Sequence, residues 1–403
     1  MTETTPVPLL VPAAGVPPVV ASAGALDAAV AVLSTGTGPV AVDTERASGY
    51  RYWQRAYLVQ LRREGAGTVL IDPIGLADLS GLAGVLNPLE WVLHAASQDL
   101  PCLAELGLVP ATVFDTELAA RLAGLERVGL AALVEALLGY QLLKGHGAAD
   151  WSRRPLPAEW LTYAALDVEL LLPLRAAIAA ELDSQGKSGW AAEEFEAVRS
   201  AGPPAPRVDP WRRTSGIHRL QKTRELAAVR ELWLARDQLA RQRDIAPGRV
   251  LPDAAIIDAA LTNPPDEPAL LSRPVFSGRA QRRHAKTWLA ALQNARALPA
   301  DELPPLRTQG SSSPPVNRWS DRDPAAAARL TAARTALTEI AEQHRLPLQN
   351  LLTPDLVRRL CWEPPDPLDA TAVERILVTG GARRWQCKLT VHPLATTLKT
   401  TTG

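Results

Sequence analysis

The sequence predicts an α/β domain over residues 25–200, followed by two all-α modules over residues 219–297 and 324–403. Three observations support this organisation. From Ala25 to about Ser200, short apolar runs alternate with helical patterns, as they do in α/β domains. Two long amphipathic segments of similar pattern then occur farther along the chain. Stretches rich in proline precede each of them, and such stretches are typical of linkers.

The elements of the α/β domain can be placed from their hydrophobic patterns. We expect strands at PVAVDTE (39–45), AYLVQLRR (56–63), TVLIDP (68–73) and WVLHAAS (91–97), the last leading into a helix. We expect helices at LAALVEALLG (130–139) and EWLTYAALDVELLLPLRAAIAAEL (159–182). The first three strands follow one another closely, so they are expected to be neighbours in a sheet.

Proline positions suggest where ordered domains begin and end. Residues 1–24 contain prolines that interrupt any apolar helix and lack a basic start, so we expect a disordered tail rather than a signal peptide. Residues 201–218 and the Pro/Ser-rich residues 298–323 are predicted linkers. No stretch reaches the roughly 18 uncharged apolar residues that span a bilayer, so no membrane segment is expected.

The cysteines are few and irregularly spaced. Only Cys102, Cys361 and Cys387 occur, an odd number without C-x-x-C spacing, which indicates neither a disulfide framework nor a zinc site. A reducing cytoplasm fits this usage. Because no coiled-coil seam is visible, we expect a monomer.

An internal repeat relates the two helical modules. The segments RELAAVRELWLARDQLARQRDI and PAAAARLTAARTALTEIAEQHRL share an amphipathic pattern, and RDIAPGRVLPD (243–253) aligns without a gap on HRLPLQNLLTP (344–354). The alignment places Ile245 on Leu346, Val250 on Leu351 and Leu251 on Leu352. Repetition on this scale indicates a duplicated helical unit.

Charge is unevenly distributed along a chain whose net charge is zero. Residues 207–296 hold 17 Lys and Arg against 9 Asp and Glu, so the first helical module is basic and the rest of the chain is acidic. Within it, Arg279, Arg282, Arg283 and Lys286 fall at helical spacing. This face would suit the phosphates of a nucleic acid, although a solvated helix face is an equally good interpretation.

Acidic residues at regular spacing suggest a metal site. Asp43 and Glu45 lie two apart in an expected strand and therefore share a face, where they could hold a hard divalent cation or simply be solvated. Tyr163 and Asp167 lie four apart in an expected helix and also share a face. Asp99 follows the apolar run WVLHAAS. Two-metal phosphodiester cleavage needs several such carboxylates to converge.

The triplet D-T-E occurs a second time, at residues 115–117, before the helical pattern LAARLAG. In that position Asp115 or Thr116 would cap the helix N-terminus, and Glu117 would interact favourably with the helix dipole. We therefore interpret this second triplet as structural and the first as the pair of ligands.

The order of these motifs points to a family. DTE at 43–45, HAASQDLPCL at 94–103 and YAALDVELLLPL at 163–174 resemble the three exonuclease motifs of ribonuclease D in the DEDD superfamily, in the branch with Tyr four residues before the last Asp. The repeated unit resembles the helicase-and-RNase-D C-terminal (HRDC) domain, of which ribonuclease D carries two. The resemblance implies a ribonuclease H-like domain, with a mixed sheet flanked by helices, followed by two HRDC-like modules.

The resemblance also implies roles for single residues. Asp43, Glu45, Asp99 and Asp167 would bind two divalent ions, Mg²⁺ or Mn²⁺, and Tyr163 would orient the attacking water. A phenol has a pKa of about 10, so it is a poor base at neutral pH and would act through its hydrogen bond. His94 and His146, near the motifs, are expected to be structural, because oxygen ligands suit Mg²⁺ better than imidazole does.

The implied activity is 3′-to-5′ removal of nucleotides from RNA 3′ ends, with tRNA precursors as the family's substrate. A DNA exonuclease shares the same motifs, and a binding scaffold without cleavage is a further alternative. One departure is visible: after DTE the family often has a bulky apolar residue, whereas this chain has Arg46 followed by three small residues. Arg46 could stack on a base or contact phosphate, or it could be a solvated arginine at a strand end.

Overall fold

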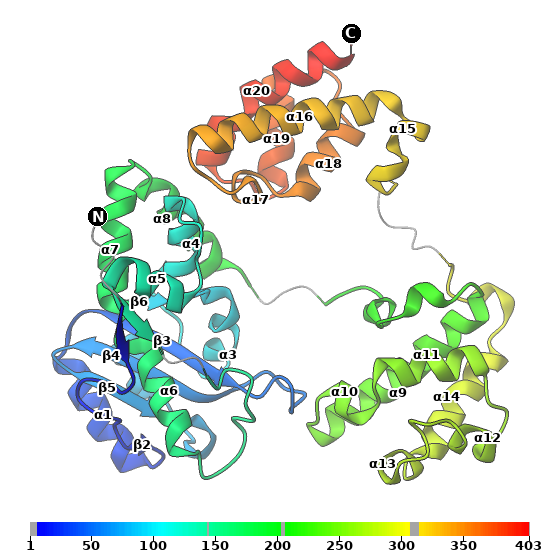
Figure 1. Cartoon of the computed structure of the whole chain (residues 1–403), viewed down its shortest axis with the longest axis horizontal. Helices are drawn as coiled ribbons and strands as arrows, with labels where there is room; N and C mark the ends of the chain where they lie inside the picture. Colours follow the sequence, from blue (N-terminus) through cyan, green and yellow to red (C-terminus); the bar gives the residue numbers. More distant parts are fainter. Residues whose placement is uncertain (1–5, 143–144, 203–205, 307–313, 403) are drawn as a thin grey trace.

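The computed structural model describes residues 6–142, 145–202, 206–306 and 314–402. Figure 1 shows an α/β domain, a first helical module (residues 206–306) and a second helical module (residues 314–402). Among the described residues, no helix combines the length and apolar character that crossing a bilayer requires.

The α/β domain is built on a six-stranded mixed sheet with the order β2-β5-β4-β3-β6-β7. Its strands are β2 (Val19–Val20), β3 (Thr37–Arg46), β4 (Ala56–Glu64), β5 (Gly67–Ile71), β6 (Glu90–Leu93) and β7 (Thr112–Asp115). β3 lies inside the sheet, antiparallel to β4 and parallel to β6. This arrangement confirms the predicted mixed sheet, with its first three long strands adjacent.

Alternating side chains of β3 face two different hydrophobic cores. Val40 and Val42 pack with α1 (Ala23–Thr35), α2 (Ser80–Leu86) and α3 (Leu100–Ala104) on one side of the sheet. Ala41 joins the core on the other side. The helices that contribute to that second core are α4 (Thr116–Ala123), α5 (Leu130–Leu138), α7 (Leu171–Ser184) and α8 (Ser188–Ser200). The two-residue period of a strand thus buries both faces of β3.

The single helix predicted over residues 159–182 is divided in two. α6 (Ala158–Glu169) ends at Leu170, where the backbone leaves the helical region, and α7 begins at Leu171. Pro173 explains the break, because its ring would collide with the carbonyl of Glu169 in a continuous helix and it has no N–H to donate. Because it is separate from α7, α6 can pack across β3, β4 and β5 in a direction of its own.

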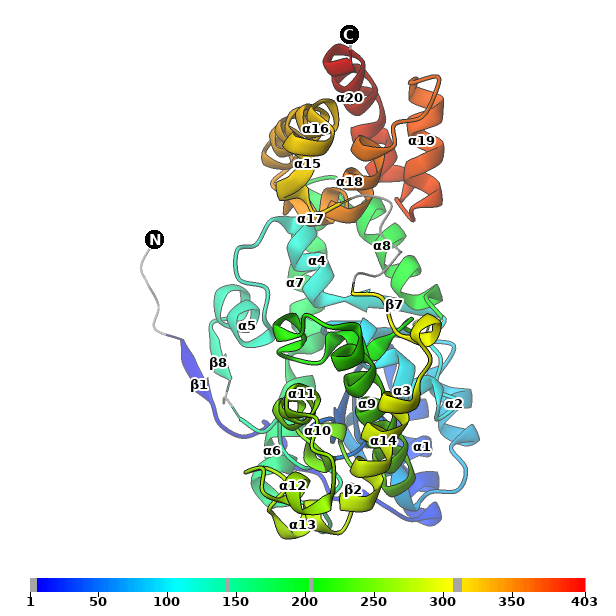
Figure 2. The same cartoon turned by 90° about the vertical axis from the view of Figure 1, so that its right-hand side faces the viewer.

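The disordered tail predicted for residues 1–24 is wrong for the part that the structure describes. β1 (Val7–Leu9) pairs in parallel with β8 (Tyr140–Leu142), β2 joins β5, and α1 already starts at Ala23. Figure 2 shows β1 lying beside β8. The prolines are tolerated because each strand is short and lies at the edge of its sheet.

The first helical module has its own core and begins before the residue predicted. Its helices are α9 (Thr223–Arg243), α10 (Pro247–Val250), α11 (Asp253–Thr262), α12 (Glu267–Leu271), α13 (Arg279–Arg282) and α14 (Ala285–Ala297). Trp211, within the linker predicted over 201–218, is 3% exposed and packs in this core. The linker is therefore shorter than predicted, and its residues 203–205 lie outside the described part of the chain.

The second helical module also begins early. Its helices are α15 (Trp319–Arg322), α16 (Pro324–Gln343), α17 (Leu348–Leu351), α18 (Pro354–Trp362), α19 (Ala370–Thr379) and α20 (Arg384–Thr402). Trp319, which was predicted to lie in the 298–323 linker, is fully buried against Trp362 and the module's core. Of that linker, residues 307–313 lie outside the described part.

The repeat predicted from the sequence has a structural counterpart. In both modules a residue with left-handed backbone follows the long helix: Asp244 (φ +48°) comes directly after α9, and Arg345 (φ +51°) lies two residues after the end of α16. A four-residue helix comes next, α10 or α17. The aligned leucines Leu251 and Leu352 are buried at the end of those short helices. We call this turn, after α9 in one module and after α16 in the other, the corner of each module.

The arginines predicted to share one helix face do not lie on one helix. Arg279 and Arg282 belong to the four-residue α13, Arg283 ends it, and Lys286 lies in α14. All four residues are exposed. The helix is interrupted at Arg283 and His284, between buried Gln281 and Ala285, so the helical spacing does not extend from α13 into α14.

Candidate active site

Strand β3 presents Asp43 and Glu45 near its C-terminal end. Both residues lie in the antiparallel ladder with β4, where Asp43 is opposite Gln60 and Glu45 is opposite Leu58. The ladder is irregular just beyond Glu45, between it and Arg46. The two carboxylates leave the same face of the strand, as their spacing predicts. Glu45 is only 5% exposed.

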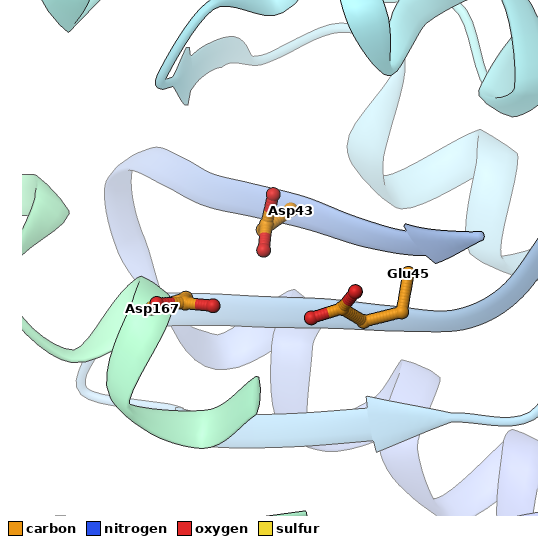
Figure 3. Close-up of side chains that lie close together, drawn as sticks. All are labelled: Asp43, Glu45 and Asp167. Atoms are coloured by element: carbon orange, nitrogen blue, oxygen red, sulfur yellow. The ribbon is translucent and has the colours of Figure 1, made fainter. Parts of the chain in front are cut away.

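Helix α6 brings Asp167 onto the same face of the sheet. The helix packs on β3, β4 and β5, and it projects Asp167 toward the two acids of β3. One carboxylate oxygen from each of Asp43, Glu45 and Asp167 lies within 4.8 Å of the others. Figure 3 shows the three carboxylates converging on one space. Such a group of oxygen ligands can hold a metal ion.

Asp99 lies beside this cluster but outside it. The strand predicted over 91–97 ends at Leu93, Ala95 adopts a left-handed backbone, and Asp99 follows a single 3₁₀ turn. The Asp99 carboxylate accepts a hydrogen bond of 2.7 Å from the Thr44 hydroxyl and lies 3.6 Å from the Arg46 guanidinium. The structure thus brings three of the four predicted acids together and holds the fourth beside them.

The carboxylates destabilise one another's charged forms. Burial, together with the charges of Asp99, Asp167 and Glu45, raises the pKa of Asp43 well above its usual value. Burial and the neighbouring acids raise the pKa of Glu45 to about 9. Burial raises the pKa of Asp167 to about 7, although a hydrogen bond from Tyr163 opposes the shift.

The pKa of Asp99 rises less, to about 6, because Thr44 and Arg46 offset part of the cost of its burial. The protein's own neighbours thus offset only part of the cost of ionising the cluster, and its carboxyl groups hold their protons more tightly than usual.

Tyr163 lies one turn before Asp167 on the same face of α6. Burial and the charge of Asp167 raise the pKa of the phenol above its usual value, so the hydroxyl stays protonated. Gly145 and Gly147 pass close to the ring: a Cβ atom added to Gly145 would lie 3.2 Å from the Tyr163 Cδ2 atom, and one added to Gly147 would lie 3.4 Å from its hydroxyl. These small residues leave the phenol access to the site.

The two histidines near the motifs have structural contacts. The His94 Nδ1 atom lies 2.9 Å from the Thr116 hydroxyl. That hydroxyl donates to the Leu93 carbonyl, so His94 must be the donor in their contact. Burial lowers the pKa of His94 to about 4, which keeps the ring neutral. His146 makes an edge contact with Tyr163 and packs against Trp160 with the two rings tilted by 33°.

One cavity of about 440 Å³ contains the whole constellation. All five predicted site residues line it, and Arg46, His94 and Gln98 line it as well. Arg46 is turned inward, donating to the Gln98 carbonyl and facing Asp99, rather than solvated at the strand end.

Sequence reasoning missed Thr44, Gly145 and Gly147 as parts of the site. Only its position between the two acids could have indicated a role for Thr44. The two-residue period of a strand assigns the Thr44 side chain to the face opposite to theirs.

The second D-T-E triplet has the structural role expected of it. The carboxylate of Asp115 accepts hydrogen bonds from the backbone N–H groups of Glu117 and Leu118 and caps α4. It also accepts from the N–H groups of Ala95 and Ala96. Glu117 forms an ion pair with Arg121 one turn later. Asp115 therefore secures both the start of α4 and the turn that leads to Asp99.

Three family models match successive parts of the chain. Residues 19–183 match a model of a 3′-5′ exonuclease domain, and residues 225–292 match the HRDC domain. Residues 312–398 match a 3′ to 5′ exonuclease C-terminal domain. The second helical module thus matches a model of its own, and its likeness to the first rests on the repeated corner.

Two solved structures resemble the whole chain. A protein from Bifidobacterium adolescentis is 38% identical with a TM-score of 0.89, and the match covers 98% of this chain and 100% of that one. Escherichia coli RNase D, described as an exoribonuclease involved in structured RNA processing, is 27% identical with a TM-score of 0.67, covering 91% and 99%.

Curated relatives give the same result. Ribonuclease D of Gluconacetobacter diazotrophicus is 32% identical over 337 residues, which cover 81% of this chain and 82% of the relative. Ribonuclease D of Acidiphilium cryptum is 34% identical over 290 residues, covering 69% and 72%. The chain therefore belongs to the ribonuclease D family of 3′-to-5′ exoribonucleases.

Proposed function

We propose that this protein removes nucleotides one at a time from RNA 3′ ends by hydrolysing the terminal phosphodiester with two divalent cations, Mg²⁺ or Mn²⁺. The observation that carries the proposal is the convergence of Asp43, Glu45 and Asp167 within 4.8 Å, in a cavity that Tyr163 and Asp99 also line. Cleavage by two metals requires such a group of carboxylates.

The residues present fit divalent cations. The cluster offers only carboxylate oxygens, which are the ligands that Mg²⁺ and Mn²⁺ prefer. Burial and mutual repulsion raise the pKa values of Asp43, Glu45 and Asp167, and a positive ion between them would remove that repulsion. We propose that Asp99, which lines the same cavity, contributes to a second set of ligands.

Each residue has a distinct part in the hydrolysis. Bound divalent ions supply activation of water and stabilisation of the leaving oxygen. Tyr163, protonated at neutral pH, holds and orients the attacking water by a hydrogen bond, since its raised pKa excludes it as a base. Thr44 fixes the Asp99 carboxylate through the 2.7 Å hydrogen bond. Arg46, beside Asp99, adds positive charge at the edge of the cavity.

The substrate we propose is the 3′ end of a structured RNA, such as a tRNA precursor. Support comes from the relatives named ribonuclease D and from the E. coli enzyme's description as acting in structured RNA processing. The basic first module could hold the body of such an RNA, with exposed Arg279, Arg282, Arg283 and Lys286 among its contacts. A cytoplasmic location and a monomeric state stay predictions from the sequence.

A single cleavage assay tests the activity, the polymer and the site together. Purified protein is incubated with a 3′-extended tRNA and with DNA of matched sequence, in Mg²⁺, in Mn²⁺ and in EDTA, beside an Asp43→Asn variant. We expect nucleoside monophosphates released one at a time from the RNA, only with a divalent ion, and a loss of roughly hundredfold or more in the variant.

The other outcomes are equally informative. Faster digestion of the DNA would replace the proposal with a DNA exonuclease, because both polymers offer the same phosphates and differ at the 2′-hydroxyl. Binding of the tRNA without any metal-dependent cleavage would instead indicate a nucleic-acid-binding scaffold.

A further inference from the structure

The two acids of β3 lie on a hairpin whose tip reaches into the first helical module. β3 ends at Arg46 and β4 begins at Ala56, and the nine residues between them form the hairpin loop. In Figure 1 this loop extends from the sheet toward α10. Between the α/β domain and the first module, every hydrogen bond of the described residues ends on residues 49–53.

Asp244, at the corner of the first module, makes the central contact. Its Oδ1 atom accepts hydrogen bonds of 3.1 Å from two consecutive backbone N–H groups, those of Tyr52 and Trp53. A carboxylate that accepts from two adjacent N–H groups fixes the direction of the backbone as well as its distance. Asp244 is the C-cap of α9 and has a left-handed backbone (φ +48°), so α9 ends at the residue that makes this contact.

Further contacts surround that of Asp244. The Tyr52 hydroxyl lies 3.2 Å from both carboxylate oxygens of Asp237, and its ring packs against the module's core. The Ala246 N–H donates to the Tyr50 carbonyl at 2.9 Å. Arg249 donates to the Gly49 carbonyl and stacks over the Tyr50 ring at 3.9 Å. The module thus contacts four of the five loop residues from Gly49 to Trp53, whereas the fifth, Arg51, donates to Ser152 within the α/β domain.

The held segment is continuous with the active site. Ala47, the first residue of the loop, is fully buried and accepts hydrogen bonds from the N–H groups of Tyr50 and Arg51. It directly follows Arg46, which faces Asp99, and the irregular point of the ladder lies between Arg46 and Glu45. A shift of the loop would therefore be transmitted to the end of β3 that carries Glu45.

We propose that Asp244 is a positioning residue for the active site: its carboxylate fixes the β3–β4 loop and, through that loop, the placement of Glu45. The first helical module then contributes to catalysis by shaping the cluster, in addition to any contact it makes with RNA. The inference rests on the proposed hydrolytic function of the cluster.

Two substitutions at the same position isolate the contact. Asp244→Asn keeps a side-chain oxygen that can accept both N–H groups, and Asn tolerates left-handed backbone. Asp244→Gly also tolerates that backbone but removes the acceptor. Asp266→Ala serves as a control within the module, because Asp266 caps α12 and, among the described residues, forms no hydrogen bond or ion pair with the α/β domain.

The measurement separates cleavage from binding. Single-turnover cleavage of oligoadenylate is followed in Mn²⁺ at saturating protein, and the affinity for the same RNA is measured in EDTA. We expect Asp244→Gly to lower the saturated rate roughly tenfold to hundredfold, with affinity changed less than about twofold. Asp244→Asn and Asp266→Ala are expected to cleave within about threefold of the unaltered protein.

Three results would overturn the proposal. Equal saturated rates for the Gly and Asn variants would show that the accepted hydrogen bonds do not matter. A weaker affinity with an unchanged saturated rate would make Asp244 an RNA-binding residue. Equal losses in Asp244→Gly and Asp266→Ala would reduce the effect to the stability of the module. Absence of metal-dependent cleavage by the unaltered protein would contradict the proposed function itself, and so is distinguishable from all three.

Discussion

Among individual residues, Tyr163 has the most restricted chemistry. Its phenol stays protonated at neutral pH because burial and Asp167 raise its pKa, so it can act only through its hydroxyl hydrogen bond. We expect Tyr163→Phe to lower kcat roughly hundredfold or more while RNA affinity is retained, because the ring keeps its packing beside Gly145. Steady-state kinetics and RNA binding in EDTA test this expectation. An unchanged kcat would remove Tyr163 from the mechanism.

The acids of the cluster predict that metal and pH act together on stability. Folding raises the pKa values of Asp99 to about 6, Asp167 to about 7 and Glu45 to about 9. Between the unfolded value of about 4 and these folded values, the folded state binds more protons, so stability falls as pH rises. In EDTA we therefore expect the free energy of unfolding to fall toward pH 9.

Saturating Mn²⁺ is expected to restore stability, and by more at high pH, where the carboxylates it binds are ionised. Urea unfolding at several pH values, in EDTA and in Mn²⁺, measures both effects. Glu45→Gln removes the group with the highest of the three values and is expected to flatten the dependence at the alkaline end. Stabilisation by Mn²⁺ that did not change with pH would contradict this account of the cluster.

The residues of the site were predictable to different degrees. Spacing alone paired Asp43 with Glu45 and Tyr163 with Asp167, because strand and helix periods determine which side chains share a face. Asp99 needed the family resemblance, and its contact with Thr44 was not predictable, because it depends on the left-handed turn at Ala95.

At the level of elements, the turn before Asp99 depends on the cap of α4. The Asp115 carboxylate accepts four backbone hydrogen bonds, two from α4 and two from Ala95 and Ala96. We expect Asp115→Ala to cost about 2 kcal/mol or more in the free energy of unfolding, measured in urea, and to lower activity through Asp99. Ser22→Ala, which removes a single exposed cap of α1, is the control and is expected to cost less than about 1 kcal/mol. Equal costs would argue against the double role of Asp115.

The sequence predicted which long segments form strands and which form helices, but it predicted their first and last residues less accurately. Apolar runs identified β3, β4 and β5 because both of their faces are buried. The break between α6 and α7 was missed, although Pro173 was its signal. β1 and β2 were missed because a strand of two or three residues has too short a pattern to show a period.

For the whole molecule, the corner of each helical module forms part of that module's contact with the α/β domain. In the first module, Asp244 and its neighbours form hydrogen bonds with the β3–β4 loop of the α/β domain. In the second, the His344 carbonyl accepts from the Lys187 ammonium at 2.6 Å, and Arg345 lies against Gly124. The duplicated corner thus serves two unlike sites, one at the active-site hairpin and one at the C-terminus of α4.

The contact between Arg345 and Gly124 predicts that one methyl group added at Gly124 lowers the stability of the protein. A Cβ atom at Gly124 would lie 2.5 Å from the Arg345 carbonyl oxygen, whereas one at Gly139 would meet nothing within 4 Å. Both glycines end helices with left-handed backbone, so alanine strains both equally. We expect Gly124→Ala to lower the free energy of unfolding by about 1–3 kcal/mol more than Gly139→Ala does, measured by denaturant titration. Equal losses would show that the corner is not packed against Gly124.

The domain order was predictable from the sequence, but the docking of the domains was not. The repeat, the basic segment and the proline-rich stretches identified two helical modules after an α/β domain. Nothing in the pattern indicated that Trp190 would stack on Trp385 at 4.9 Å, or that Glu194 would pair with Arg383 across the second interface. Such contacts join side chains nearly 200 positions apart, and no local period encodes them.

The acidic cluster can be tested as the catalytic site with the D-T-E triplet that the chain carries twice. Glu45 lies in the acidic cluster, and Glu117 occupies the same place in the second D-T-E but pairs with Arg121 on α4. Mn²⁺-dependent release of nucleotides from the 3′ end of an RNA is measured for Glu45→Gln and Glu117→Gln side by side. We expect Glu45→Gln to lose roughly hundredfold or more in rate and Glu117→Gln to stay within about twofold of the unaltered protein. Equal rates in the two variants would contradict the assignment of this cluster as the active site.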